Sequence, residues 1–281
     1  MKGAIYYSEN ESVRNRLFID DLMKEAEQIN IDLRLIVGDE QPDADVDFIL
    51  FRDRNPALAT KFEREGFRLC NRAEVNRIAN DKLKSFELAT LLGVAAVPTK
   101  KVQHINQIDT YPCVLKTVDG HGGQEVTLCT SAAQVEAFFT QFHDHTIIVQ
   151  PYIESGARDI RVFMIGEEVI GAVKRTGNGS FKSNYTLGGS VEKYSLASWQ
   201  EQEAKRIAKA LNSDYIGIDF ILLPDGRWLF NEIEDPVGAR SLYTTHDFSV
   251  AGKLMGAIKE RLSCKTLERF IKQPSLAKSG L

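Results

Sequence analysis

The sequence has no long apolar run, no paired cysteine motif and no surplus of basic residues. A membrane-spanning helix needs ~20 consecutive apolar residues, and no segment approaches that length. The N-terminus, MKGAIYYSENES, lacks the apolar core of a signal peptide. A formal net charge of −4 gives no basic footprint for nucleic acid or for an anionic membrane. We therefore expect a cytoplasmic protein with neither a membrane nor a nucleic-acid partner.

Motifs for several common chemistries are also missing. The four cysteines and five histidines are scattered and make no CxxC pair or ligand pattern, so we expect buried free thiols and no zinc site. Neither a P-loop, GxxxxGK(S/T), nor a dinucleotide fingerprint, GxGxxG, occurs. No Ser-His-Asp or Cys-His arrangement is indicated. These absences fit phosphoryl transfer, in which positioning and charge neutralisation carry most of the catalysis.

The length of 281 residues is enough for one large domain or two to three small lobes. Apolar periodicity predicts an α/β protein. The N-terminal part alternates strand and helix patterns, which indicates a small, mostly parallel sheet. Its expected strands are residues 4–7, 33–37, 48–51 and 67–70. The expected strands of the later part are residues 111–117, 125–128, 146–152, 160–165 and 169–174.

The segment from residue 216 to 234, IGIDFILLPDGRWLFNEIE, predicts a β-hairpin turned by Asp225-Gly226. We take these two residues as the loop and count outward along both arms. The facing pairs are then Leu223 with Trp228, Ile221 with Phe230, and Asp219 with Glu232.

Three carboxylates of this hairpin gather at one end of one face. Alternation of side chains with period two places Glu234 beside the pair of Asp219 and Glu232. Like charges ~5 Å apart cost about 3 kcal/mol per pair at an effective dielectric near 20. A hard divalent cation removes this repulsion, and carboxylate oxygens are the ligands that Mg²⁺ prefers. The hairpin therefore predicts a magnesium site, with a solvated charged edge as the alternative.

A lysine and a glycine-rich segment suggest a phosphate site. Lys116 lies inside an apolar strand, where its charge needs an anionic partner or a route to solvent. The segment Asp119-Gly120-His121-Gly122-Gly123 follows at once, and glycines let backbone N–H groups approach a phosphate closely. A tight hairpin turn would explain the glycines equally well.

The expected strands 160–165 and 169–174 form a central hairpin turned near Gly166. This hairpin and the segment after the carboxylates carry further charges. Alternation places Asp159 and Arg161 on one face, with Arg175 on the facing arm. They suit a nucleotide sugar and developing phosphate charge, or they form a surface ion pair. Arg240 suits a substrate carboxylate, or a salt bridge to Glu232 or Glu234.

Several short strings, taken in order, make the chain resemble the ATP-grasp ligases, closest to their RimK-like glutamate-ligase branch. The resemblance runs from about Asn71 to Leu262. The strings are Asn80-Asp81-Lys82, Leu92-Gly93 through Val97-Pro98-Thr99, Val114-Leu115-Lys116 with the Gly-rich segment, Val149-Gln150-Pro151-Tyr152-Ile153, Arg158-Asp159-Ile160-Arg161, Phe181-Lys182-Ser183-Asn184 with Gly188-Gly189, Gly217-Ile218-Asp219, and Asn231-Glu232-Ile233-Glu234.

This resemblance implies an ATP-grasp fold preceded by a Rossmann-like pre-ATP-grasp layer. The implied parts are residues 1–78 for that layer, 79–152 for the small lobe, 153–264 for the C-terminal lobe and 265–281 for a tail.

The resemblance implies ATP as a cofactor, with one or two Mg²⁺ ions or, alternatively, Mn²⁺. It also implies a role for each matching residue. The residues implied to bind ATP are Lys82, Lys116, Gly120, Gly122, Gly123, Gln150, Pro151, Tyr152, Ile153, Asp159 and Lys182. Those implied at the reacting groups are Arg161, Arg175, Asn184 and Arg240, and the implied metal ligands are Asp219, Glu232 and Glu234.

Three positions depart from the family pattern. The metal motif usually ends Glu-x-Asn, whereas its third residue here is Glu234. The usual Pro-Gly pair is split as Pro236-Val237-Gly238, and Pro151 stands where a hinge Glu is common. The extra charge at Glu234 bears on metal number and preference.

We expect an ADP-forming carboxylate–amine ligase that makes an amide or peptide bond through an acyl phosphate. Its substrates would be small-molecule or peptide carboxylates and amines. The alternatives are an ATP-grasp kinase acting on a hydroxyl group and a nucleotide-binding module without turnover. The sequence names no substrate and leaves a homo-oligomer open.

Overall fold

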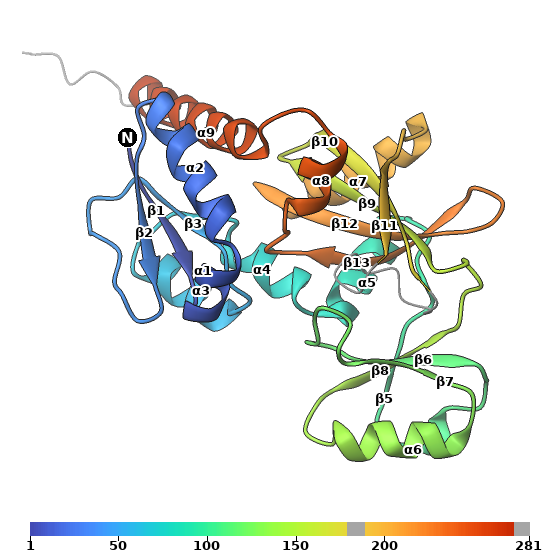
Figure 1. Ribbon diagram of the computed structural model, residues 1–281. Helices are drawn as coiled ribbons and strands as arrows, with labels where there is room; N and C mark the ends of the chain where they lie inside the picture. Colours follow the sequence, from blue (N-terminus) through green and yellow to red (C-terminus); the bar gives the residue numbers. More distant parts are fainter. Residues whose placement is uncertain (179–188, 273–281) are drawn as a thin grey trace, which may run out of the picture.

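The computed structural model describes residues 1–178 and 189–272, with residues 265–272 as backbone alone. Within these ranges it contains three sheets, each with helices packed against it (Figure 1). No described helix is long and apolar enough to cross a membrane. The predicted site residues Lys182 and Asn184 lie outside the described residues.

The N-terminal sheet is parallel throughout, in the order β2-β1-β3-β4. Ile5 and Leu50 face a core shared with α2 and the long helix α9, whereas Tyr6 and Phe51 face α3. This alternation confirms the predicted parallel layer. Its elements are β1 (Lys2–Tyr7), α1 (Glu9–Arg14), α2 (Arg16–Gln28), β2 (Asp32–Val37), β3 (Phe48–Phe51), α3 (Pro56–Arg64), β4 (Leu69–Cys70) and α4 (Ala73–Ala79), with α9 at Val250–Lys272.

The small sheet is antiparallel, in the order β5-β8-β6-β7. One helix, α6, packs against it through Val135 and Phe138 (Figure 1). The Gly-rich segment joins β6 to β7, so both of its ends are held by paired strands. The elements are α5 (Lys82–Leu91), which precedes the sheet, β5 (Lys100–Val102), η1 (Ile105–Gln107), β6 (Cys113–Thr117), β7 (Val126–Cys129), α6 (Ala132–Gln141) and β8 (Ile147–Pro151).

The large sheet is antiparallel, in the order β11-β10-β9-β12-β13. Helix α7 buries Ala204 and Ile207 against one of its faces. The strand β11 was not predicted, and it adds an edge beside β10. The elements are β9 (Arg158–Ile165), β10 (Glu168–Thr176), β11 (Ser190–Lys193), α7 (Ser198–Leu211), β12 (Tyr215–Leu222), β13 (Trp228–Glu234) and α8 (Arg240–Thr245).

The hairpin β12–β13 has the predicted pair of Asp219 and Glu232, but two predicted pairs are wrong. Leu222, not Leu223, faces Trp228, because the turn is one residue longer than a two-residue loop. Ile221 consequently faces Leu229 instead of Phe230. A β-bulge then adds one residue on β13 and restores the predicted register at Asp219.

The bulge also changes which side chains share a face. Counting with strict alternation places Trp228 and Phe230 at the far end of the face that carries the carboxylates. This prediction is wrong, because both pack with Phe220 in the core beneath α7. The extra residue, Asn231, lines the same pocket as Glu232. The bulge therefore directs two neighbouring polar side chains of β13 to the site.

The free cysteines are three buried thiols, Cys70, Cys113 and Cys129, and the exposed Cys264. The expectation of buried thiols is therefore wrong for Cys264, which lies on the polar, C-terminal part of α9.

Candidate active site

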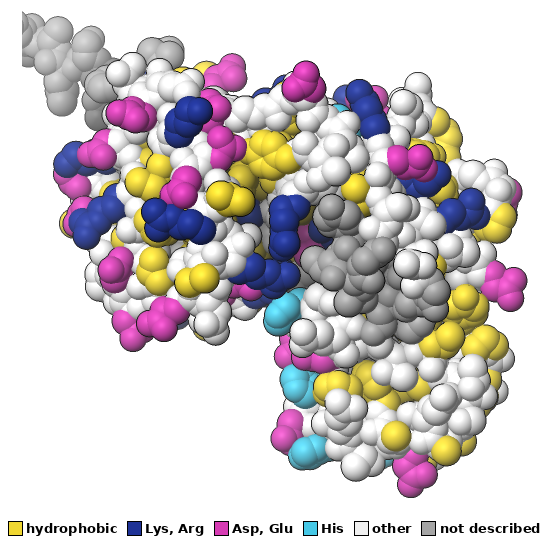
Figure 2. All heavy atoms as spheres, in the orientation of Figure 1, with side chains coloured by type: hydrophobic (Ala, Val, Ile, Leu, Met, Phe, Trp, Pro, Cys, Tyr) yellow, Lys and Arg dark blue, Asp and Glu magenta, His cyan; other side chains and the backbone are white. Residues whose placement is uncertain are grey.

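One pocket lies where the three sheets meet. Its lining comes from the ends of β1 and β3, from the Gly-rich segment and from β8, β9, β10 and β13. Figure 2 shows Lys and Arg side chains gathered at the hollow beside the N-terminal part. The predicted site residues in this lining are Lys82, Lys116, Gly120, Gly122, Gly123, Gln150, Pro151, Tyr152, Ile153, Asp159, Arg161, Arg175, Glu232, Glu234 and Arg240.

The three predicted metal ligands lie together. Asp219, Glu232 and Glu234 each offer a carboxylate oxygen, and these atoms lie within 4.8 Å of one another. Asp219 is fully buried behind the pocket wall, whereas the other two line the pocket. Three carboxylates at this separation suit a hard divalent cation. The donor set therefore fits Mg²⁺.

Two arginines hold the deepest carboxylates. Arg161 donates to Asp219 at 2.7 and 2.6 Å and to Glu234 at 2.6 Å. Arg175 donates to Asp159 at 2.6 and 2.7 Å and to Asp219 at 2.7 Å. Burial acts to raise the pKa of Asp219, but the two guanidinium groups outweigh it and lower that pKa. Asp219 therefore stays ionised.

Glu232 differs from its neighbours because no hydrogen bond or ion pair holds its side chain among the residues that the structure describes. Burial, and then the charge of Glu234, raise the pKa of Glu232, whereas Lys82 and Lys116 oppose this effect. Its carboxylate is the one that a cation would relieve most.

Two lysines face the carboxylates. Lys116 is buried on β6, and its Nζ donates to Asn231 Oδ1 at 2.9 Å. Burial lowers the pKa of Lys116 to about 8, with Glu232 acting in the opposite direction. Lys82 begins α5, whose N-cap Asp81 accepts from Lys84 N at 3.0 Å. The Lys82 Nζ donates to the Gly120 carbonyl and thus contacts the Gly-rich segment directly.

The Gly-rich segment needs its glycines. Gly122 and Gly123 have φ values of +65° and +74°, which disfavour other residues. A Cβ on Gly120 would lie 2.4 Å from Thr117 Oγ1. The segment therefore needs glycine at these positions, which a phosphate-binding loop and a tight hairpin turn both use.

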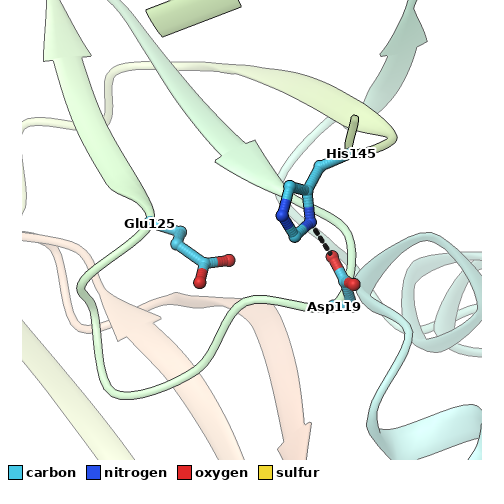
Figure 3. Close-up of side chains that lie close together, drawn as sticks. All are labelled: Asp119, Glu125 and His145. Atoms are coloured by element: carbon cyan, nitrogen blue, oxygen red, sulfur yellow. Dashed lines mark hydrogen bonds and ion pairs between the residues drawn. The ribbon is translucent and has the colours of Figure 1, made fainter. Parts of the chain in front are cut away.

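A second group of ligand-type side chains lies at the two ends of this loop (Figure 3). His145 Nδ1 lies 3.1 Å from Asp119 Oδ1, and Glu125 points toward both from the start of β7. Hydrogen bonding to Asp119 raises the pKa of His145. Glu125 also accepts from Thr117, so the group ties the loop's ends to β6 and to the segment that precedes β8.

The predicted hinge lies along the end of β8. Gln150 is buried, and its Nε2 donates to Thr99 Oγ1 at 2.8 Å. Tyr152 N–H donates to the Pro112 carbonyl at 3.3 Å, and Pro151 has no N–H. Of Pro151, Tyr152 and Ile153, only Ile153 has a backbone N–H without a partner among the described residues. This N–H is available to a ligand.

The pocket wall from the N-terminal sheet contains cations that sequence reasoning missed. Arg52 is buried and donates to the Val237 carbonyl at 2.6 Å, and Arg54 lines the pocket two residues later. Arg240 stands opposite at the start of α8 and is exposed. Neither Arg54 nor Arg240 forms an ion pair within the described ranges, so the predicted alternative of a salt bridge to Glu232 or Glu234 is wrong.

Asparagines fix the chain just after the predicted metal ligands. Asn71 and Asn76 donate to the Asp235 carboxylate at 2.9 and 3.1 Å, and Asn80 donates to the Asp235 carbonyl at 2.8 Å. Burial raises the pKa of Asp235 to about 6. These contacts hold the end of β13 against α4, and no spacing in the sequence could have revealed them.

Comparisons with known proteins agree with this geometry. A family model described as the RimK-like ATP-grasp domain matches residues 79–258. The chain is 29% identical over 247 residues to "Uncharacterized protein MG011 homolog" of Mycoplasma pneumoniae, covering 86% of each protein. It is 30% identical over 216 residues to a "Probable alpha-L-glutamate ligase" of Pseudomonas fluorescens, covering 73% of this chain and 71% of that protein.

Among solved structures, D-cycloserine synthetase DcsG superposes with a TM-score of 0.76 at 17% identity. The match covers 93% of this chain and 100% of that one, which shows a shared fold.

Proposed function

Because the chain belongs to the RimK-like ATP-grasp family, we propose that it is an ATP-dependent carboxylate–amine ligase that works through an acyl phosphate. A substrate carboxylate oxygen attacks the γ-phosphorus of ATP, the bond to the β,γ-bridging oxygen breaks, and ADP leaves. The amine nitrogen then attacks the acyl carbon, inorganic phosphate leaves, and an amide forms. The amine gives up its proton to solvent or phosphate.

One observation supports this proposal above the others. Two lysines, two arginines and three carboxylates converge on a single pocket, although they come from two sheets and from α5. In a water-poor cleft, preorganised charge of both signs stabilises phosphoryl transfer without a positioned base.

The phosphates would bind between the lysines and the Gly-rich loop. Lys82 and Lys116 supply positive charge, and the loop's backbone N–H groups supply donors. The Ile153 N–H would read the adenine edge, and Asp159 would accept from the ribose. The structure places all of these groups in the same lining.

The carboxylates of Asp219, Glu232 and Glu234 would hold one or two Mg²⁺ ions. Bound there, the metal would offset phosphate charge and orient the transferred group. Arg161 and Arg175 line the pocket directly above Asp219, so they would contact the acyl phosphate oxygens.

The substrates would enter against the wall that carries Arg54 and Arg240. Two cations that pair with no carboxylate among the described residues suit a substrate that keeps a free carboxylate away from the reacting one. Since the relatives include proteins named as glutamate ligases, glutamate and short acidic peptides come first as candidate substrates.

A screen for ADP release tests the function. The purified chain is incubated with ATP, MgCl₂ and a panel of amino acids and small peptides, and products are identified by mass spectrometry. Hydroxylamine is added in a parallel series to trap the acyl phosphate. We expect ADP together with an amide product and, with hydroxylamine, a hydroxamate.

The competing functions give different products in the same screen. A stable phosphoester without a hydroxamate would instead identify a hydroxyl kinase. Failure of every carboxylate and amine pair to release ADP, with ATP still bound, would identify a nucleotide-binding module. The variant Glu232→Gln serves as the inactive control, because it keeps the size of the side chain and removes its charge.

A further inference from the structure

A side-chain hydrogen bond joins the small sheet to the large sheet across the pocket. Lys116 Nζ, on β6, donates to Asn231 Oδ1, on β13, at 2.9 Å. Among the described residues, no other side-chain hydrogen bond or ion pair connects residues 100–151 with residues 153–264. Lys116, the cation of β6 that faces the pocket, is therefore hydrogen-bonded to a residue of the opposite sheet.

The β-bulge is what places Asn231 there. Without the extra residue, strict alternation along β13 would put residues 230, 232 and 234 on one face and residue 231 on the other. Instead Phe230 enters the core, while Asn231 and Glu232 both line the pocket. Bulges re-aim side chains in this way beside active sites.

The acceptor on Asn231 is neutral, and this property matters for Lys116. The lysine is buried, so its charge is costly, and the nearby Glu232 favours that charge. Since Glu232 has no ion-pair partner in the described part of the chain, a released Lys116 would pair with it. That pair would remove one cation from the phosphates and one carboxylate from the metal.

We propose that Asn231 is a positioning residue for nucleotide binding. Its amide oxygen holds the Lys116 ammonium over the pocket and apart from Glu232, without neutralising the charge that the phosphates need. The phosphate role of Lys116 rests on the proposed function. The role of Asn231 follows from its contact with Lys116 and from its place in the bulge.

Two variants of Asn231 test the proposal, with binding measured by calorimetry in EDTA so that no metal contributes. Asn231→Leu removes the acceptor. We expect ATP to bind about tenfold more weakly, a change of ~1.4 kcal/mol, because Lys116 is no longer held over the pocket. Adenosine, which has no phosphate, should bind as it does to the wild type.

Asn231→Asp keeps the size and an acceptor but adds a negative charge. The new carboxylate would pair with Lys116, so we expect weaker ATP binding together with an unchanged or higher Tm. If Asn231 had only a structural role, ATP affinity and Tm would instead change in the same direction. This variant keeps the test valid if Asn231→Leu folds poorly.

A double-mutant cycle with Lys116→Met tests whether Asn231 affects ATP binding through Lys116. We expect Asn231→Leu to cost little further ATP affinity once Lys116 is gone. Arg227→Ala, at the exposed tip of the same hairpin, is the matched control and should bind ATP like the wild type.

Three results would overturn the inference. They are wild-type ATP affinity in Asn231→Leu, equal losses for ATP and adenosine, and additive losses in the cycle. A wild-type protein that binds no ATP would instead overturn the proposed function, so the two failures are distinguishable.

Discussion

The Arg161 guanidinium binds the buried Asp219 carboxylate through two parallel hydrogen bonds of 2.7 and 2.6 Å. Arg175 contacts the same carboxylate from β10 at 2.7 Å. Asp219 thus carries two cations, whereas Glu232, its facing residue on β13, carries none within the described ranges. Replacing each carboxylate by its neutral amide should therefore affect the stability of the protein differently.

Replacing Asp219 by Asn should reduce both activity and stability. The change leaves two buried guanidinium groups short of a counter-charge, which typically costs ~3–5 kcal/mol. Urea unfolding of the metal-free protein measures this loss as a lower transition midpoint. An Asp219→Asn variant with the wild-type midpoint would contradict the ion-pair account, and full turnover would exclude Asp219 from the metal site.

Replacing Glu232 by Gln should separate activity from stability. Burial raises the pKa of Glu232, so its ionised form is costly and the neutral amide should leave Tm unchanged or higher. Because the same carboxylate would hold Mg²⁺, ATP-dependent turnover should fall more than a hundredfold. Mn²⁺ binding followed by electron paramagnetic resonance provides a second measurement, and unaltered Mn²⁺ affinity would remove Glu232 from the ligand set.

Local patterns were sufficient for much of this structure. The alternation of apolar residues predicted the parallel layer, and the β9–β10 hairpin formed about Gly166 as expected. The pair of Asp219 and Glu232 is confirmed. It was reached through two errors that cancel, since the turn is longer than predicted and the bulge restores the count. The division of the chain at residues 78, 152 and 264 stays a prediction.

Contacts between distant segments could not be read from the sequence. Asn231 reaches the pocket because of the bulge, and Asn71 reaches Asp235 from 164 positions away. Arg54 lines the pocket wall beside Arg52, which contacts the Val237 carbonyl in the segment after β13. A pattern of residue types specifies which side chains can bind a ligand, but packing decides which of them meet.

Activity should decrease above about pH 8 through Lys116. Burial lowers the pKa of this lysine from 10.5 to about 8, so its positive charge is present below that pH and is lost above it. Since kcat/KM reports ionisation in the free enzyme, kcat/KM for ATP should fall about tenfold per pH unit beyond pH 8. Lys116→Met should abolish this alkaline limb, and a limb that persists in the variant would assign it to another group.

Gly120→Ala should weaken ATP binding. The added Cβ would lie 2.4 Å from Thr117 Oγ1 and 2.5 Å from Glu125 Oε2, so the base of the Gly-rich loop would have to shift. We expect the KM for ATP to rise about tenfold, roughly 1.4 kcal/mol, while Tm changes little. Gly256→Ala is the control, because its Cβ would meet nothing within 4 Å. Equal kinetics for the two variants would remove this loop from the nucleotide site.

Arg240→Gln and Arg54→Gln should raise the KM for the carboxylate substrate and leave the KM for ATP unchanged. Both arginines line the pocket on the side of the N-terminal sheet and α8, and neither pairs with a carboxylate in the described part of the chain. Loss of one charge-assisted hydrogen bond to substrate corresponds to about a tenfold change. A larger loss for glutamate than for its side-chain amide would assign the contact to a side-chain carboxylate. Equal losses for the two would place it at the α-carboxylate, and a raised KM for ATP would move both arginines to the nucleotide.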